Sequence, residues 1–228
     1  MVAWLQRQWT GISLWHGLLI PLSWLFFSIT ALRRLAYRLH LLTTHQLPVP
    51  VIVVGNISVG GTGKTPLVIY LAQQLQQRGW RVGIISRGYG GTASTPTAVT
   101  PDSNPLVVGD EPLLIARRTQ CHLWIGRDRP AAARALLAAH PEVNVIISDD
   151  GLQHYALART LNIAVIDGAR GFGNARLLPA GPLRESVSRL SSMNAIVINQ
   201  TGHLHPSIPT TLPHYAMHLQ GTQFRQLK

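Results

Sequence analysis

"VIVVGNISVGGTGKTPLVIYLAQQL" is the sequence of residues 51–75, and most of the fold can be inferred from it. The apolar run at 51–54 predicts a buried β-strand, and the pattern at 65–78 predicts an amphipathic helix that ends at Gly79. The glycine-rich turn SVGGTGKT, residues 58–65, lies between the two. This arrangement is typical of phosphate binding, because backbone amides converge at the start of the helix.

The turn is close to the phosphate-loop pattern G-x-x-x-x-G-K-[ST], with Ser58 at the position where the pattern has glycine. Lys64 would reach the β- and γ-phosphates of a nucleotide, and the Thr65 hydroxyl would hold Mg²⁺. The residues expected to bind the nucleotide are Ser58, Val59, Gly60, Gly61, Thr62, Gly63, Lys64 and Thr65. The alternative is a glycine-rich turn that binds nothing, and the flanking strand, the helix and the lysine argue against it.

The charge of the chain favours anionic partners. Twenty residues are Lys or Arg and nine are Asp or Glu, which gives a formal net charge of +11 over 228 residues. Such a field attracts phosphorylated substrates, acidic lipid surfaces or nucleic acid. Lysine occurs only at positions 64 and 228, so the single internal lysine lies in the glycine-rich turn. The one cysteine, Cys121, excludes an internal disulfide and fits a reducing compartment.

The N-terminal part of the chain predicts a membrane-associated segment. Residues 11–32 contain no Asp, Glu, Lys or Arg, and their number is about what a helix needs to cross a hydrocarbon core. The arginines at 33–38 favour a cytoplasmic location for the C-terminal side, and the pattern does not match a cleaved secretory signal. Alternatives are a helix or two half-helices in the membrane interface, since Pro21 interrupts the run, and an apolar helix packed on the domain.

Downstream of a linker at 43–50, apolar strands alternate with helices. Besides the first strand and helix, strands are expected at 80–86, 122–126, 143–150, 161–167 and 194–200, and helices at 109–119 and 128–140. Continuous apolar strands separated by helices mean a mostly parallel sheet with helices on both faces. The expected fold is an α/β, P-loop NTPase-like domain over 43–228, preceded by the membrane-associated segment 1–42.

Two neighbouring aspartates follow an apolar strand. Asp149 and Asp150 are expected at the carboxyl edge of the sheet, where open α/β folds bind ligands and where an acid supports Mg²⁺ in phosphate-loop enzymes. Neighbouring residues of an extended chain point in opposite directions, so we expect one aspartate near the metal and the other facing either substrate or the residues behind the metal ligands. His154 is expected close by. The alternative role for such an aspartate is to cap the next helix.

Three further charged residues are candidates for the site. Asp110 follows another apolar stretch, and it could accept a proton from an attacking hydroxyl or only cap the following helix. Arg184 and Glu185 follow a bend rich in proline and glycine. An arginine there suits phosphate or transition-state charge, and a glutamate suits metal or the orientation of an arginine. The alternative is a surface ion pair.

The order of the motifs resembles the tetraacyldisaccharide 4'-kinase family, the lipid A 4'-kinases of Gram-negative bacteria. The motifs are GNISVGGTGKTP, SRGYGG, VGDEP, DR, SDDGLQH and LPAGPLRE, and with the apolar N-terminus they cover nearly the whole chain. Each motif alone is unspecific, whereas the combination of GGTGKTP, DDGLQH and GPLRE is highly specific. The serine at the first position of the phosphate loop also resembles this family's own version.

The resemblance implies a kinase that uses ATP and Mg²⁺ to phosphorylate the 4'-hydroxyl of an acylated glucosamine disaccharide 1-phosphate. It implies a location at the cytoplasmic face of the inner membrane, in contact with its lipid. By this resemblance, Lys64 and Thr65 fall on the nucleotide and Mg²⁺ positions, and Asp110 on the acid that activates the sugar hydroxyl. The other active-site positions that it implies are Asp149, Asp150, His154, Arg129, Arg184 and Glu185, with Asp149 and Asp150 also near the metal.

Members of the family continue for about another hundred residues beyond the matching motifs. The resemblance therefore predicts that the C-terminal part of the family fold, with a histidine of a catalytic pair, is missing from this chain. Residues 43–228 are then expected to contain the kinase domain and the start of a second α/β lobe.

Two other functions compete with this interpretation. A membrane-associated P-loop ATPase or GTPase switch would act on a protein partner, and NQT at 199–201 is faintly similar to the base-reading position of GTPases. The N-K-x-D pattern of GTPases and the L-S-G-G-Q pattern of transporter subunits are both absent from the sequence. Nucleic-acid binding rests on charge alone, and the arginines are scattered rather than interleaved with aromatic residues. We expect no nucleic acid and no obligate protein partner.

Overall fold

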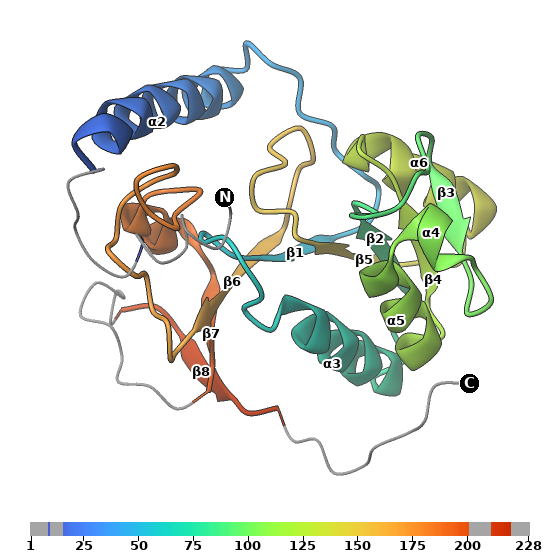
Figure 1. Ribbon diagram of the computed structural model, residues 1–228. Coiled ribbons are helices and arrows are strands. Elements are labelled where there is room, and N and C mark those ends of the chain that lie inside the picture. Colours follow the sequence, from blue (N-terminus) through green and yellow to red (C-terminus); the bar gives the residue numbers. More distant parts are fainter. Residues whose placement is uncertain (1–8, 10–15, 201–210, 220–228) are drawn as a thin grey trace.

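The computed structural model describes residues 9, 16–200 and 211–219. Eight strands form one sheet in the order β3-β4-β2-β5-β1-β6-β7-β8 (Figure 1). Neighbouring strands are parallel except for β3, which is antiparallel to β4. The mostly parallel sheet predicted from the sequence is therefore confirmed. The strands are β1 Val51–Gly55, β2 Val82–Ser86, β3 Thr97–Val99, β4 His122–Ile125, β5 Val145–Asp149, β6 Leu161–Asp167, β7 Ala195–Asn199 and β8 His214–Met217.

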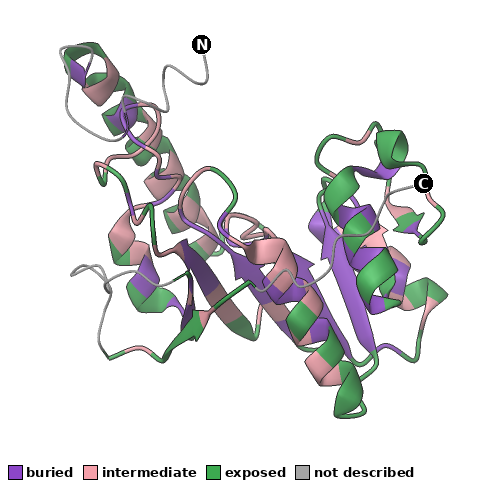
Figure 2. Cartoon of the chain, turned by 60° about the horizontal axis from the view of Figure 1, so that its bottom comes forward, coloured by how far each residue is buried: buried purple, intermediate pink, exposed green. Residues whose placement is uncertain are grey.

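The strands are apolar on both sides because both faces of the sheet are covered. On β1, Val51 and Val53 belong to the core on one face, whereas Val54 belongs to the core on the other. This alternation follows from the two-residue period of a strand. Figure 2 shows the central strands as the most buried part of the molecule, and β1, β2 and β5 are buried at nearly every position.

Different elements cover the two faces. Helix α6 (Arg129–Ala139) and the 3-10 helix Val187–Ser192 pack on one face, and helices α3 (Lys64–Gln77) and α5 (Asp110–Thr119) pack on the other. A short helix, α4 (Pro105–Val108), precedes α5. Because each crossover helix returns the chain to the same edge, the carboxyl ends of the parallel strands meet at one side of the sheet.

Helix α2 (His16–Arg38) lies apart from the helices that cover the sheet and occupies the opposite end of the molecule from α5 and α6 (Figures 1 and 2). It is continuous through Pro21, so within the described residues the interpretation as two half-helices is wrong. By length and composition it could cross a membrane. Most of its apolar side chains face outward, with Leu18 and Leu32 68% and 69% exposed, so the interpretation as a helix that buries its apolar surface on the domain is also wrong.

Polar contacts fasten the first half of α2 to the segment 174–180. The Ser23 hydroxyl donates to the Leu177 carbonyl at 2.9 Å and accepts from the Ala180 amide at 3.0 Å. The imidazole of His16 lies 3.2 Å from the Asn174 amide group, measured between Nε2 and Nδ2. His16 and Ser23 are the buried residues of the helix, so α2 is held at a few points and leaves its apolar surface open.

Candidate active site

The phosphate loop joins the end of β1 to the start of α3, at the carboxyl edge of the sheet. Gly63 (φ 91°) directly precedes Lys64, the first residue of α3, and Gly60 (φ 104°) lies in the middle of the loop. Both φ values are in the left-handed region that favours glycine. The loop therefore leads into the N-terminus of a helix in the way that phosphate binding requires.

Two side chains beyond the predicted motif lie against this loop. Asn199, the last residue of β7, is buried and donates from Nδ2 to the Thr62 carbonyl at 3.2 Å. Arg170 donates to the Gly61 carbonyl and forms an ion pair with Asp167, the last residue of β6, with an Nε–Oδ2 distance of 2.6 Å. The sheet order places β6 and β7 on the side of β1 away from β5, so the loop has polar side chains on both sides.

Asp150 joins the loop to the segment after the proline-rich bend. Its Oδ1 lies 3.6 Å from Nζ of Lys64, and its Oδ2 lies 3.1 Å from Nη1 of Arg184. Burial acts to raise the pKa of Asp150, but the charges of Lys64 and Arg184 outweigh it and hold the pKa below its ordinary value. The carboxylate is therefore ionised and orients two cations at the mouth of the loop.

Asp149, the last residue of β5, is 1% exposed. Its carboxylate accepts a hydrogen bond from the Ser86 hydroxyl at 3.1 Å, and its carbonyl accepts one from Nη2 of the buried Arg129 at 2.8 Å. Burial raises the pKa of Asp149 to about 6, the charges of Asp150 and Glu111 add to the shift, and Arg129 opposes it. A carboxyl with such a pKa is poised to bind either a proton or a cation near neutral pH.

The two aspartates face different partners, but the alternation of an extended chain, from which different directions were expected, does not explain this. The assignment of one aspartate to the metal and the other to substrate stays a prediction. Asp150 is not in extended chain, since its φ is 48°. Aspartate tolerates this left-handed conformation better than most residues, and the turn swings its side chain toward Lys64 while Asp149 stays in the strand. The alternative that the pair only caps a helix is also wrong, because no helix starts within the turns that follow it at 150–160.

The donor set fits a magnesium ion. Oδ1 of the buried Asp149 has no hydrogen-bond partner among the described residues. An orphaned buried carboxylate oxygen costs free energy unless a ligand satisfies it. The Thr65 hydroxyl, in the first turn of α3, and the carboxylate of Asp150 add further oxygen donors at this edge of the sheet. Mg²⁺ prefers such hard oxygen ligands together with water and phosphate.

His154 lines a cavity of about 410 Å³ beside the phosphate loop. Asp150 and Arg184 line the same cavity, and so do Phe26 and Arg33 of α2. Burial lowers the pKa of His154 to about 4, and the charges of Arg129 and Arg87 act in the same direction. The imidazole is therefore neutral at physiological pH and can accept a proton or a hydrogen bond.

Arg184 and Glu185 do not form the surface ion pair considered from the sequence. Glu185 is 8% exposed and accepts hydrogen bonds from the Tyr155 hydroxyl and, at 3.3 Å, from Nε2 of Gln153. Its Oε1 also lies 3.7 Å from Nε of Arg189. Arg184 pairs with Asp150 instead, so the two neighbours have different partners, although both line the same cavity.

Asp110 is the first residue of α5 and is exposed. Its side chain has no hydrogen bond or ion pair with the described residues. Gly109 takes the cap position before it with φ 89°, so Asp110 is not the helix cap that the sequence allowed. The start of α5 nevertheless influences the site, because the charge of Glu111, in its first turn, raises the pKa of Asp149.

The sequence reasoning missed several residues of this site. They are Ser86, Gln153, Tyr155, Asp167, Arg170, Arg189 and Asn199. Each contacts the phosphate loop or one of the predicted residues, except Asp167, which pairs with Arg170. Four of them could have been predicted from their positions in the sequence. Ser86, Asp167, Arg170 and Asn199 lie at or just after the ends of apolar strands, which parallel strands bring to one edge.

The fold and the site define a P-loop NTPase-like α/β protein, with a phosphate loop between β1 and α3 and acids at the end of β5. Over residues 15–228 the sequence matches the family described as tetraacyldisaccharide-1-P 4'-kinase. The chain belongs to that family.

Individual relatives agree with this assignment. The chain is 58% identical over 214 residues to a tetraacyldisaccharide 4'-kinase of Methylobacillus flagellatus, covering 92% of this chain and 64% of the relative. It is 55% identical over 222 residues to that of Herminiimonas arsenicoxydans, covering 97% and 61%. The crystal structure of LpxK from Aquifex aeolicus in complex with ATP superposes with a TM-score of 0.78 at 35% identity, covering 88% of this chain and 64% of that one. The chain thus spans less than two thirds of the length of these relatives.

The buried carboxyl of Asp149 predicts a stability that falls as the pH rises from about 4 to about 6, the pKa in the folded chain. Below this window the carboxyl is neutral in both states, and above it the folded chain must hold a buried charge. Asp149→Asn removes that charge, so its free energy of unfolding should exceed that of the wild type by up to about 3 kcal/mol at pH 7 and should match it near pH 4.

Urea unfolding at a series of pH values, with a chelator present, measures this difference. Asp102→Asn, which changes an exposed aspartate, is the matched control and should follow the wild type throughout. A difference between Asp149→Asn and the wild type that stays constant with pH would show that the carboxyl does not titrate as described.

Proposed function

We propose that this protein transfers the γ-phosphate of ATP to the 4'-hydroxyl of a tetraacyl glucosamine disaccharide 1-phosphate, a step in lipid A biosynthesis. Family membership supports the reaction. The observation that carries the proposal is the cavity in which Phe26, Thr30 and Arg33 of α2 share walls with Asp150 and Arg184. It joins an apolar helix to a phosphate site, which is what a kinase of an acylated sugar needs.

The proposed nucleotide site is the phosphate loop. Lys64 and the loop amides neutralise the terminal phosphates, while Thr65 and the two aspartates would hold Mg²⁺, which when bound screens the charge of the phosphate oxygens. Phosphoryl transfer requires mainly positioning and neutralisation of charge. In this proposal Arg184, fixed by Asp150, adds a positive charge where the transferred group would lie.

The proposed proton acceptor for the sugar hydroxyl is Asp110. Its freedom from any partner in the described part of the chain supports this role, since an unpaired carboxylate can approach a substrate without breaking an ion pair. His154, neutral and buried in the cavity wall, is proposed to orient the acceptor. Arg129 and Glu185 are proposed as positioning residues, because Arg129 holds the backbone of Asp149 and Glu185 fixes the cavity wall through Tyr155.

We further propose that residues 1–42 bind the cytoplasmic face of the inner membrane of a Gram-negative bacterium, with 43–228 as the kinase domain. The exposed apolar side chains of α2 support membrane contact, and Arg33, Arg34 and Arg38 at its end suit anionic lipid headgroups. A site held at the bilayer meets a membrane-embedded substrate at a raised effective concentration.

Lys64→Ala should lower the transfer of labelled γ-phosphate from ATP to the disaccharide by at least about 100-fold, because the charge that neutralises the terminal phosphate is lost. The label that enters the lipid is measured with substrate in mixed micelles, and calorimetry of ATP binding is run on the same proteins. Arg78→Ala, an exposed cation at the far end of α3, should behave as the wild type in both assays.

Unchanged transfer and ATP affinity in Lys64→Ala would contradict the nucleotide role. A rate of ATP hydrolysis that does not change when the disaccharide is added, but increases when a protein partner is added, would instead favour the switch function.

Removing the apolar face of α2 should weaken membrane binding by more than about 100-fold, since each leucine that enters the membrane contributes about 1.5–3 kcal/mol. Three exposed leucines lie seven residues apart on this helix, and the variant is Leu18→Ser, Leu25→Ser and Leu32→Ser. Sedimentation with vesicles of zwitterionic and anionic phospholipid measures the bound fraction.

The matched control changes three exposed leucines of the domain, in the variant Leu106→Ser, Leu114→Ser and Leu161→Ser. It should bind vesicles as the wild type does. Equal loss in both triple variants, or no loss in the α2 variant, would contradict the assignment of α2 as the membrane contact.

A further inference from the structure

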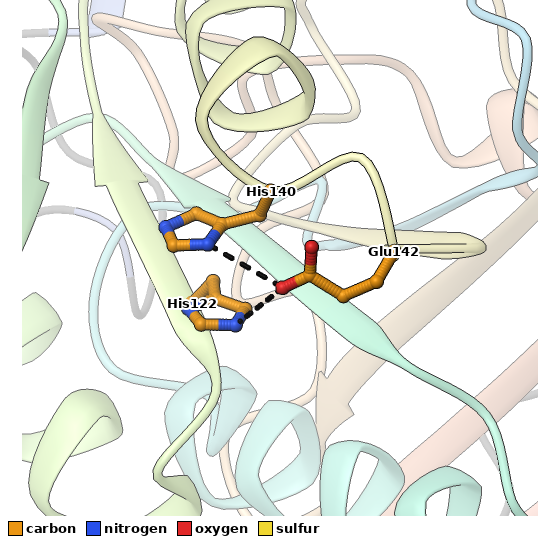
Figure 3. A group of neighbouring side chains, drawn as sticks. All are labelled: His122, His140 and Glu142. Atoms are coloured by element: carbon orange, nitrogen blue, oxygen red, sulfur yellow. Dashed lines mark ion pairs between the residues drawn. The ribbon is translucent and has the colours of Figure 1, made fainter.

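Two histidines and a glutamate meet on the surface of the domain (Figure 3). Nε2 of His122 lies 3.1 Å and Nδ1 of His140 lies 3.5 Å from the same carboxylate oxygen of Glu142. The two imidazole rings are stacked, with centroids 3.5 Å apart and planes inclined by 12°. One ligand atom from each of the three residues lies within 4.8 Å of the other two.

The chain topology explains why these residues meet. His122 is the first residue of β4, and His140 follows the end of α6, the helix that leads from β4 to β5. A crossover helix runs antiparallel to its strands, so its end returns to the edge where the strands begin. The cluster thus lies at the amino edge of the sheet, whereas the phosphate loop and Asp149 lie at the carboxyl edge, and none of its residues lines a described cavity of the active site.

The donor chemistry selects a class of ion. Two imidazole nitrogens and one carboxylate oxygen suit zinc and the neighbouring divalent transition metals, and they do not suit Mg²⁺ or Ca²⁺, which prefer sets of oxygen ligands. Bonds of about 2.0–2.2 Å would place the ion between the two nitrogens and the carboxylate oxygen. Both nitrogens already lie within 3.5 Å of one carboxylate oxygen. All three side chains are partly exposed, so the stacked rings have room to rotate apart until both nitrogens point at one ion.

The same side chains without a metal form only a weak arrangement. An ion pair between partly exposed groups is screened by water and contributes little to stability. A divalent cation bound by both imidazoles and the carboxylate would replace this weak contact with metal–ligand bonds.

We propose that His122, His140 and Glu142 bind one divalent transition-metal ion, with zinc as the best match, outside the active site. Three protein ligands leave a fourth position of the tetrahedron for water. The ion would link the start of β4 to the turn between α6 and β5. Because α6 begins at Arg129, which holds Asp149, the ion would stabilise the elements that support the active site from their far end.

The test is the binding of ZnCl₂ to the full chain, measured by calorimetry in the presence of excess MgCl₂. The wild type should bind one equivalent that Mg²⁺ does not displace, and its thermal midpoint should rise on zinc addition. His122→Ala, His140→Ala and the nearly isosteric Glu142→Gln should each weaken this binding by about 10-fold or more and abolish the shift in midpoint.

The chain contains ten histidines, so the controls change histidines outside the cluster. The double variant His45→Ala and His214→Ala, at two exposed positions, should bind zinc as the wild type does. Far-UV circular dichroism without metal checks that each variant is folded. Zinc affinity that is unchanged in His122→Ala and His140→Ala, or a wild type that binds no zinc at micromolar concentration, would overturn the proposal and leave the cluster as an ion pair.

Discussion

The carboxylate of Asp150 is the contact on which the arrangement of the site depends. It lies between Lys64 of the phosphate loop and Arg184 of the segment after the proline-rich bend, at 3.6 Å and 3.1 Å. Two cations held near one point would repel each other without an anion between them. Asp150 therefore allows a concentrated positive charge at the mouth of the loop, which is the charge that a triphosphate requires.

This contact also connects parts of the chain that are far apart in sequence. Asp150 follows β5, Lys64 begins α3, and the segment of Arg184 continues from residues 174–180, to which Ser23 fastens α2. Helix α2 and the phosphate loop are thus connected through one stretch of backbone. Phe26 and Arg33 of this helix line the same cavity as Asp150 and Arg184.

The sequence predicted the sheet and the loop well, because periodicity and glycine positions are local signals. It also placed Asp149 and Asp150 at the carboxyl edge of the sheet, since strand ends in a parallel sheet meet at one edge. It could not show that Glu185 is buried and bonded to Tyr155, or that Asn199 bonds to the loop, because these contacts join residues far apart in the chain. The left-handed turn at Asp150 is likewise fixed by tertiary contacts, and alternation along a strand gives no sign of it.

A double-mutant cycle of Lys64→Met and Asp150→Asn tests the central contact most directly. The free energy of unfolding is measured in urea without nucleotide for the wild type, both single variants and the double variant. We expect a coupling energy of roughly 1 kcal/mol or more, because Asp150→Asn leaves the partly buried Lys64 without its partner, and Lys64→Met leaves Asp150 with Arg184 alone. Effects that add to within about 0.5 kcal/mol would show that the two charges do not interact, and would contradict the account.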